Sequence, residues 1–222
     1  MVRAVFIDYT GTLVQEDEPY TRKLIAYFME HSDVKDPRQI LSFVWSKVKE
    51  IEAESYGPNF AKIDERTDRI LAACVEQCGL RGDLAYMHEI WSKIWVHAPL
   101  FDDVKTFFER CKVPIYVLSN DDSCYLEESF RLKGLRPAGI ISAEMAQACK
   151  PHLDIFRKAL EVAGVSADEV VHIGDSVTSD VEPAKQLGIT PIYLSRGRDV
   201  QLDGVRVIRS LDELESLVFF RT

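Results

Sequence analysis

Four short segments, in each of which an apolar run is followed by Gly, Ser or Asp, constrain the fold of this 222-residue chain more than any other feature. They occupy residues 2–8, 113–121, 169–176 and 190–197. Segments that are apolar at nearly every position are typical of interior strands in a parallel sheet that is covered on both faces. Two weaker strand candidates lie at 138–142 and 205–210.

Helical patterns alternate with these segments. They cover residues 102–112, 123–134, 152–164 and 178–188, and the last three end in Gly134, Gly164 and Gly188. Glycine is favoured there because the residue after a helix commonly adopts a left-handed conformation. The alternation predicts an α/β fold with a doubly wound parallel sheet, in which ligands bind at the carboxyl ends of the strands.

Residues 16–97 interrupt this alternation. They contain helical patterns only, at 20–31, 37–55, 64–79 and 82–98. A stretch of this length between the first strand and the next is too long for a simple crossover connection. We therefore expect a helical domain at 16–97, inserted into an α/β core domain made of residues 1–15 and 98–222.

The composition of the chain limits the kinds of partner that it can bind. Lys and Arg number 27 against 36 Asp and Glu, giving a net charge of −9. An acidic chain without a basic run is a poor candidate for binding nucleic acid. No apolar run reaches the roughly 18 residues that span a bilayer, no signal-peptide pattern is present, and the five scattered cysteines favour reduced thiols. We expect a cytoplasmic monomer or homodimer without membrane or nucleic-acid partners.

Aspartates follow two of the predicted strands. Asp8 ends the first strand, Asp175 follows the strand at 169–174, and Asp180 lies five residues further on. Carboxylates that converge at one sheet edge repel each other, and Mg²⁺, which prefers oxygen ligands, removes that repulsion. Asp8 would then stay ionised and could act as a nucleophile. Taken singly, each aspartate is also consistent with capping the following helix.

Lys150 and the pair Ser119-Asn120 are the candidate anion-binding residues. Lys150 precedes Pro151 at a loop end, and its ammonium group could balance nearby carboxylates and bind a phosphate. Ser119 and Asn120 follow a predicted strand and offer hydroxyl and amide donors. A solvated surface lysine and a turn or helix cap are the alternatives for these residues taken alone.

The motifs Asp-x-Thr-Gly-Thr-Leu, Leu-Ser-Asn, Lys-Pro and Gly-Asp-Ser-x-x-x-Asp occur in this order at the predicted strand ends. In this combination the chain resembles the haloacid dehalogenase-like superfamily of hydrolases, in its C1-capped phosphatase-type branch. The resemblance covers nearly the whole chain, and the helical insert looks like the C1 cap. It implies a Rossmann-like core, Mg²⁺ as cofactor and a small anionic phosphorylated substrate.

The resemblance also implies roles for individual residues. Asp8 would be the nucleophile that forms an aspartyl intermediate. Asp8, Asp175 and the backbone carbonyl of Thr10 would bind Mg²⁺, and Asp180 would steady the site. The phosphate-binding residues would be Ser119, Asn120 and Lys150. Such a set suits phosphoryl transfer, in which the protein mainly positions groups and offsets charge.

Thr10 departs from the pattern of the resembled phosphatases, which usually carry a second Asp there as general acid and base. A threonine hydroxyl does not titrate near neutral pH, and loss of such a group costs ~10²–10⁴ in rate. The chain is then a slow phosphatase, a dehalogenase-like or phosphonatase-like hydrolase, or a binding or regulatory module with impaired catalysis. A relation to P-type ATPases is excluded, because no transmembrane run exists.

Polar side chains at a few further positions lie close to these motifs. Tyr9, next to Asp8, either faces the substrate or packs in the core. His172 lies inside an apolar run and is interpreted as a hydrogen-bonded buried histidine. Asp121 and Asp122 are expected at a helix start and in a solvated loop.

Overall fold

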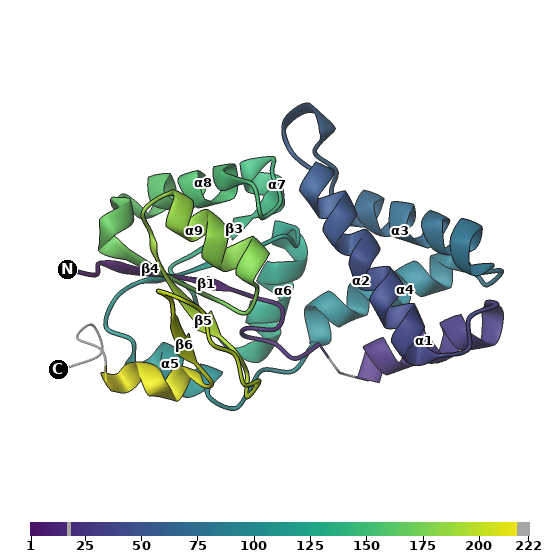
Figure 1. Ribbon diagram of the computed structural model, residues 1–222, viewed down its shortest axis with the longest axis horizontal. Coiled ribbons are helices and arrows are strands. Elements are labelled where there is room, and N and C mark those ends of the chain that lie inside the picture. The colour runs from purple at the N-terminus through teal and green to yellow at the C-terminus, as the bar shows by residue number, and fades with distance from the viewer. Residues whose placement is uncertain (17–18, 217–222) are drawn as a thin grey trace.

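The computed structural model describes residues 1–16 and 19–216. Within them, a parallel sheet of six strands has the order β3-β2-β1-β4-β5-β6 (Figure 1). The strands are β1 (Ala4–Asp8), β2 (Ile115–Ser119), β3 (Gly139–Ser142), β4 (Val170–Gly174), β5 (Thr190–Leu194) and β6 (Arg206–Ile208). All six lie inside the segments predicted from the sequence, and the two weaker candidates form β3 and the edge strand β6.

Helices cover both faces of the sheet. They are α5 (Val104–Arg110), α6 (Ser123–Lys133), α7 (Ala143–Ala146), α8 (Leu153–Ala163) and α9 (Glu182–Gln186). Alternate residues of β1 enter different hydrophobic clusters: Val5 and Ile7 pack with Phe107 of α5 and Phe130 of α6, whereas Ala4 and Phe6 pack with Phe156 of α8 and Ala184 of α9. This arrangement confirms the predicted doubly wound α/β fold.

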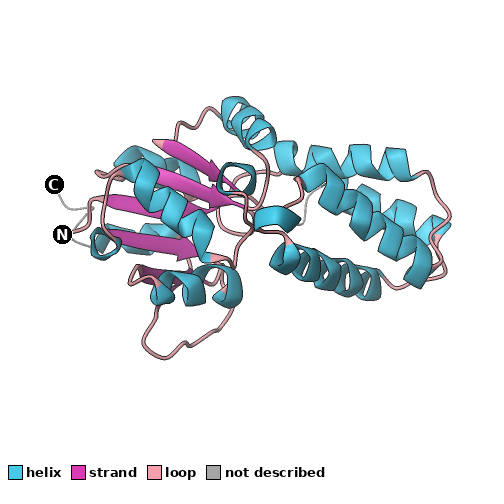
Figure 2. Ribbon diagram, turned by 90° about the horizontal axis from the view of Figure 1, so that it is seen from above, coloured by secondary structure: helices cyan, strands magenta, loops and turns pink. Residues whose placement is uncertain are grey.

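The insert between β1 and β2 is helical, as predicted. Its helices are α1 (Pro19–His31), α2 (Pro37–Glu54), α3 (Ile63–Cys78) and α4 (Leu84–His97), with a short 3₁₀ turn at Gly57–Asn59. They enclose a hydrophobic cluster of their own, which contains Phe28, Ile40, Leu71, Cys74 and Met87. Figures 1 and 2 show these helices to one side of the sheet. The proposed domain limits at residues 15/16 and 97/98 stay a prediction.

The chain after β4 differs from the predicted single helix at 178–188. It forms a π-helical turn, Val177–Val181, followed by the short helix α9. The carbonyl of Ser176 accepts hydrogen bonds from the amides of both Asp180 and Val181. Pro183 has no amide hydrogen, so a regular helical ladder cannot continue through it. The wide turn places Asp180 beneath the end of β4.

The remaining short elements are the 3₁₀ turns Ala167–Glu169 and Leu211–Ser216. None of the helices in the described ranges combines the length and the apolar character needed to cross a bilayer.

Candidate active site

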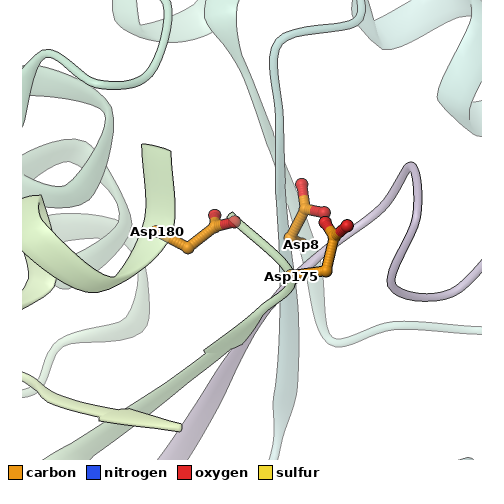
Figure 3. Close-up of side chains that lie close together, drawn as sticks. All are labelled: Asp8, Asp175 and Asp180. Carbon is orange, nitrogen blue, oxygen red and sulfur yellow. The ribbon is translucent and has the colours of Figure 1, made fainter. Parts of the chain in front are cut away.

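Three aspartates converge at the carboxyl edge of the sheet. Asp8 ends β1, Asp175 directly follows the neighbouring strand β4, and Asp180 lies in the turn beyond it. One carboxylate oxygen from each lies within 4.8 Å of the others (Figure 3). Neighbouring parallel strands bring together residues that are far apart in the sequence, and the structure therefore shows the convergence that the sequence predicts.

Lys150 is buried between two of these carboxylates. Its side chain is 4% exposed, and its Nζ lies 2.5 Å from Oδ1 of Asp8 and 2.7 Å from Oδ1 of Asp180. Burial disfavours the ammonium ion, but Asp180 and Asp8 overcome this and raise the pKa of Lys150. A surface lysine is excluded by this geometry.

Asp180 holds Lys150 in place. Its Oδ1 also lies 3.0 Å from Nε2 of His172, and its Oδ2 accepts the backbone amide of Ser176 at 3.1 Å. Although burial opposes ionisation, the charge of Lys150 and the hydrogen bonds from His172 and Lys150 lower the pKa of Asp180 to about 2. Both oxygens of Asp180 are therefore engaged by the protein, and His172 is a hydrogen-bonded buried histidine, as interpreted from the sequence.

Gly174 leaves the space that Asp180 occupies. A Cβ atom at position 174 would lie 2.3 Å from Cγ of Asp180 and 2.5 Å from its Cβ. We expect Gly174→Ala to lower the free energy of unfolding by at least about 1–3 kcal/mol, because an added methyl group in a well-packed site forces its neighbours to shift. Urea denaturation measures this change. An unchanged midpoint at an unchanged slope would show that Asp180 is not fixed there.

The carboxyl groups of Asp8, Asp175 and Asp180 lie around the buried cation of Lys150, and the more exposed Arg198 lies 3.4 Å from Oδ2 of Asp175. Burial, then the charges of Asp8 and Asp180, raise the pKa of Asp175 to about 8. Burial likewise raises the pKa of Asp8. The backbone at Gly11 lies close to the side chain of Asp175. Gly11 has φ +79°, and a Cβ atom there would lie 2.7 Å from Oδ2 of Asp175. An oxygen-rich, electronegative donor set of this kind fits a hard divalent cation such as Mg²⁺.

Mg²⁺ is therefore expected to stabilise the fold. At a concentration about 100 times its dissociation constant, a ligand that binds only the native state adds about 2.7 kcal/mol. For a chain of this size this raises the midpoint of thermal unfolding by roughly 5–10 °C. Differential scanning calorimetry with and without Mg²⁺ measures the shift. If the Asp175→Asn protein showed the same shift, the ion would bind at a site that does not include Asp175.

Thr10 lies in the turn after β1, where it forms an isolated backbone bridge with Val14. Thr10 is half-buried and directly precedes Gly11 in the sequence. The roles assigned to its carbonyl and to its side chain stay predictions.

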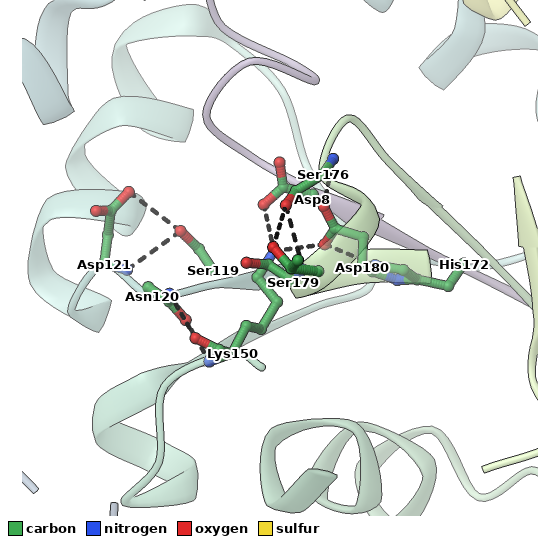
Figure 4. A network of polar contacts seen from close by, with 10 residues as sticks. Asp8, Ser119, Asn120, Asp121, Lys150, His172, Ser176, Ser179 and Asp180 are labelled. Carbon is green, nitrogen blue, oxygen red and sulfur yellow. Dashed lines mark hydrogen bonds and ion pairs between the residues drawn. The ribbon is translucent and has the colours of Figure 1, made fainter. Parts of the chain in front are cut away.

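Ser119 and Asn120 lie at the end of β2, whose Leu118 pairs with Asp8. The Ser119 hydroxyl donates to Oδ2 of Asp121 at 3.1 Å. Oδ1 of Asn120 accepts the backbone amide of Lys150 at 2.6 Å, and its Nδ2 donates to the Lys150 carbonyl at 3.2 Å (Figure 4). The side chain of Asn120 thus fixes the backbone that carries Lys150, a use that sequence reasoning missed.

The expectation of a solvated loop at Asp121 and Asp122 was wrong. Their exposed fractions are 8% and 4%. Asp122 accepts the backbone amide of Ile63 from the helical insert, at 3.3 Å. The insert lies over this loop and removes it from water, and no local sequence pattern signals such a contact.

Arg66 and Glu52 are further residues near the site that sequence reasoning missed. Arg66 of α3 is 3% exposed, and its guanidinium group donates to the carbonyl of Asn120. It also lies 3.4 Å from Oε1 of Glu52 on α2. Burial raises the pKa of Glu52 to about 7, with Arg66 opposing the shift. The insert therefore brings one cation and one carboxyl group to the edge of the sheet.

Tyr9 packs in the core. Its side chain is fully buried, and its hydroxyl lies 3.2 Å from the carbonyl of Trp95 and contacts Ser129. Burial raises the pKa of its hydroxyl. Of the two alternatives for Tyr9, the structure therefore supports packing.

The carboxylate cluster and the buried lysine lie at the carboxyl edge of a Rossmann-like sheet, the edge at which doubly wound α/β proteins bind their ligands. Residues 2–188 match the family description of the haloacid dehalogenase-like hydrolases, and the chain belongs to that family. The predictions of the family, of the fold class and of a hydrolase are thereby confirmed.

Two relatives with different names illustrate the similarity. The chain is 24% identical to the glyceraldehyde 3-phosphate phosphatase of Methanocaldococcus jannaschii, over 98% of this chain and 97% of that protein. It is 40% identical to the haloacid dehalogenase-like hydrolase domain-containing protein 3 of Danio rerio, over 34% of this chain and 33% of that protein.

Solved structures share the fold. The L-2-haloacid dehalogenase of Xanthobacter autotrophicus superposes with a TM-score of 0.78 at 19% identity, over 98% of each chain. YfnB, a HAD-hydrolase of Bacillus subtilis bound to magnesium, superposes with a TM-score of 0.74 at 18% identity, over 96% of this chain and 97% of that one.

Proposed function

We propose that this chain is a Mg²⁺-dependent phosphatase that hydrolyses a small phosphorylated metabolite through a covalent intermediate on Asp8. The observation that carries the proposal is the placement of Asp8, with its Oδ1 2.5 Å from the buried ammonium of Lys150 and its carboxylate beside Asp175. The nearly full-length similarity to a protein named as a glyceraldehyde 3-phosphate phosphatase supports a phosphate ester as the substrate.

In this proposal, Asp8 and Asp175, with the Thr10 carbonyl, would hold Mg²⁺, which supplies positive charge at the transferring phosphoryl group. The carboxylate of Asp8 attacks phosphorus, and the bond from phosphorus to the leaving oxygen breaks. Lys150 stays protonated and offsets the charge of the phosphoryl oxygens. Asp180 keeps the ammonium of Lys150 in position, since Lys150 lies 2.7 Å from it.

Thr10 determines the rate in this proposal. The leaving oxygen must gain a proton, and the water that later cleaves the intermediate must lose one. Thr10 cannot exchange a proton near neutral pH, so both steps are slower than with an aspartate there. The phosphorylated form of Asp8 is then expected to persist, and substrates with good leaving groups are preferred.

We further propose that residues 16–97 act as a cap that excludes water and selects the substrate. The contacts of Arg66 and Ile63 with the loop after β2 support this role, because they bring the insert onto the edge of the sheet that carries Asp8. A cytoplasmic location, a monomer or homodimer, and the absence of nucleic-acid and membrane partners stay expectations from composition.

A dehalogenase-like reaction is the second candidate, since dehalogenases are among the structures with the same fold and Thr10 suits chemistry that needs no leaving-group proton. The two reactions differ in their need for Asp175. Phosphoryl transfer needs a cation, held by Asp175, to stabilise the phosphoryl oxygens, whereas a dehalogenase substrate has no phosphoryl group and its halide leaves as an anion. The Asp8–Asp175 pair therefore favours the phosphatase.

A panel of phosphate monoesters, phosphonates and haloacids, assayed with Mg²⁺ and with EDTA, tests the proposal. We expect release of inorganic phosphate from monoesters that depends on Mg²⁺. Halide release that is insensitive to EDTA would replace the proposal with the dehalogenase. Anion binding without turnover on any of these substrates would identify a binding or regulatory module.

A further inference from the structure

The hydroxyl group of Ser119 has one proton, and the structure directs it to Asp121. Oγ of Ser119 donates to Oδ2 of Asp121 at 3.1 Å, and the backbone amide of Asp121 donates to the same Oγ at 3.2 Å (Figure 4). Both side chains are buried, with exposed fractions of 3% and 8%. A serine hydroxyl offers one donor and two acceptor positions, so only an acceptor position remains for a third partner.

A phosphate oxygen without a proton can only accept a hydrogen bond. The hydroxyl of Ser119, as long as its proton is held by an ionised Asp121, therefore has the wrong polarity to bind it. A protonated Asp121 reverses this relation, because its own O–H can donate to the second acceptor position of Oγ. The Ser119 proton is then free to turn toward the phosphate.

We propose that Asp121 is a positioning residue for phosphate binding, whose protonation decides whether Ser119 donates its hydrogen bond to the substrate. The inference rests on the proposed function and on the role that the family resemblance implies for Ser119, whose hydroxyl would contact the transferring phosphoryl group. It adds a residue from outside the motifs, two positions after Ser119, that acts through the serine.

The surroundings of Asp121 make it easier to protonate than an exposed aspartate. Burial raises the pKa of Asp121 to about 6; Arg66 of α3 opposes the shift, and the charges of Asp8 and Asp122 add to it. Within the described residues, Glu52 of α2 and the hydroxyl of Tyr9 also face Asp121.

The direction of the pH effect follows from this. The pKa of Asp121 in the fold lies above its usual value, so the neutral carboxyl and the free Ser119 proton are present below about pH 6 and are lost as the pH rises through that value. A bound dianion adds negative charge beside Asp121 and raises its pKa further. Anion and proton therefore bind together, each favouring the other.

Sulfate binding tests the inference, because sulfate stays a dianion between about pH 5 and about pH 8 and undergoes no turnover. With saturating Mg²⁺, calorimetry on the wild-type protein is expected to show affinity at least about tenfold weaker at the upper pH. Asp121→Asn should remove most of this dependence, since its amide donates to Ser119 at every pH. Asp122→Asn is the matched control and should keep the dependence, with its midpoint moved to lower pH because the charge of Asp122 raises the pKa of Asp121.

The Ser119→Ala variant distinguishes an effect of Asp121 that acts through the serine from direct charge repulsion between ionised Asp121 and the sulfate. If the serine carries the effect, its removal weakens sulfate binding at low pH and leaves a nearly flat profile. A Ser119→Ala protein that retains the full wild-type dependence would overturn the inference and leave the proposed phosphatase standing, with Asp121 acting only by its charge. Absence of sulfate binding at every pH would overturn the inference, whereas the proposed phosphatase is decided separately by release of phosphate from monoesters.

A measurement on the wild-type protein alone tests the inference without relying on the folding of any variant. Sulfate binding near pH 7 is compared calorimetrically in buffers with different ionisation enthalpies. We expect uptake of a substantial fraction of one proton for each sulfate bound, because Asp121 is mostly ionised at that pH and must become neutral. Binding without proton uptake would contradict the inference.

Discussion

Asp8→Asn is expected to lower the turnover of any phosphate monoester by at least about 10⁴-fold, the scale seen when an enzyme loses its nucleophile. The substituted amide keeps the shape of the carboxyl group, but its nitrogen and oxygen carry no negative charge with which to attack phosphorus. The Lys150 ammonium remains paired with Asp180 at 2.7 Å, so the site is expected to keep its framework. Steady-state release of phosphate measures the loss.

The exposed Asp154 offers a matched control for this substitution. It lies in the first turn of α8 and pairs with Arg157, at 2.9 Å on the surface. Asp154→Asn is expected to keep wild-type turnover, because surface ion pairs contribute little. If Asp8→Asn retained turnover within tenfold of wild type under the same conditions, Asp8 would not be the nucleophile.

Thr10→Asp is expected to raise the turnover of substrates with poor leaving groups by about 10²–10⁴-fold, the range that general acid–base catalysis contributes. The position follows the nucleophile by two residues, in the same turn, and its side chain is half-buried rather than packed in the core. A carboxyl group there can protonate an alkoxide and then activate water. An aryl phosphate should gain only in the cleavage of the intermediate by water, because its leaving oxygen needs little protonation.

Thr10→Asn distinguishes acid–base chemistry from a change of shape. Its amide has nearly the size of the Asp side chain but does not titrate, so the alkyl phosphate rate should stay at the wild-type level. Equal gains for Asn and Asp, or no gain for Asp with an alkyl phosphate, would show that the missing acid–base group at position 10 does not limit the reaction.

The sequence predicts most of the fold because the signals are local. Each strand is an apolar run that ends at a polar residue, and each sheet-covering helix carries its own periodicity. The convergence of Asp8 and Asp175 follows from topology alone, since residues at the ends of adjacent parallel strands must lie side by side. Lys150 could be assigned only by resemblance, because a lone lysine in a loop has no local signal of burial.

The parts that escaped prediction depend on contacts distant in sequence. The burial of Asp121 and Asp122 requires the insert to lie over the loop after β2, and Arg66 reaches Asn120 across 54 positions. The clamp between Asn120 and the Lys150 backbone joins two loops 30 positions apart. The π turn that contains Asp180 reflects Pro183 together with the two amides that share the Ser176 carbonyl. Periodicity and residue spacing carry no information about such pairings.

Phosphorylation of Asp8 is the most direct test of the mechanism. Protein mixed with Mg²⁺ and an aryl phosphate is quenched in acid within a single turnover, and its peptides are analysed by mass spectrometry. We expect a peptide heavier by one phosphoryl group with the modification at Asp8, and a larger modified fraction in wild type than in Thr10→Asp. Phosphate release at a normal rate with no label on Asp8 would contradict covalent catalysis by this carboxylate.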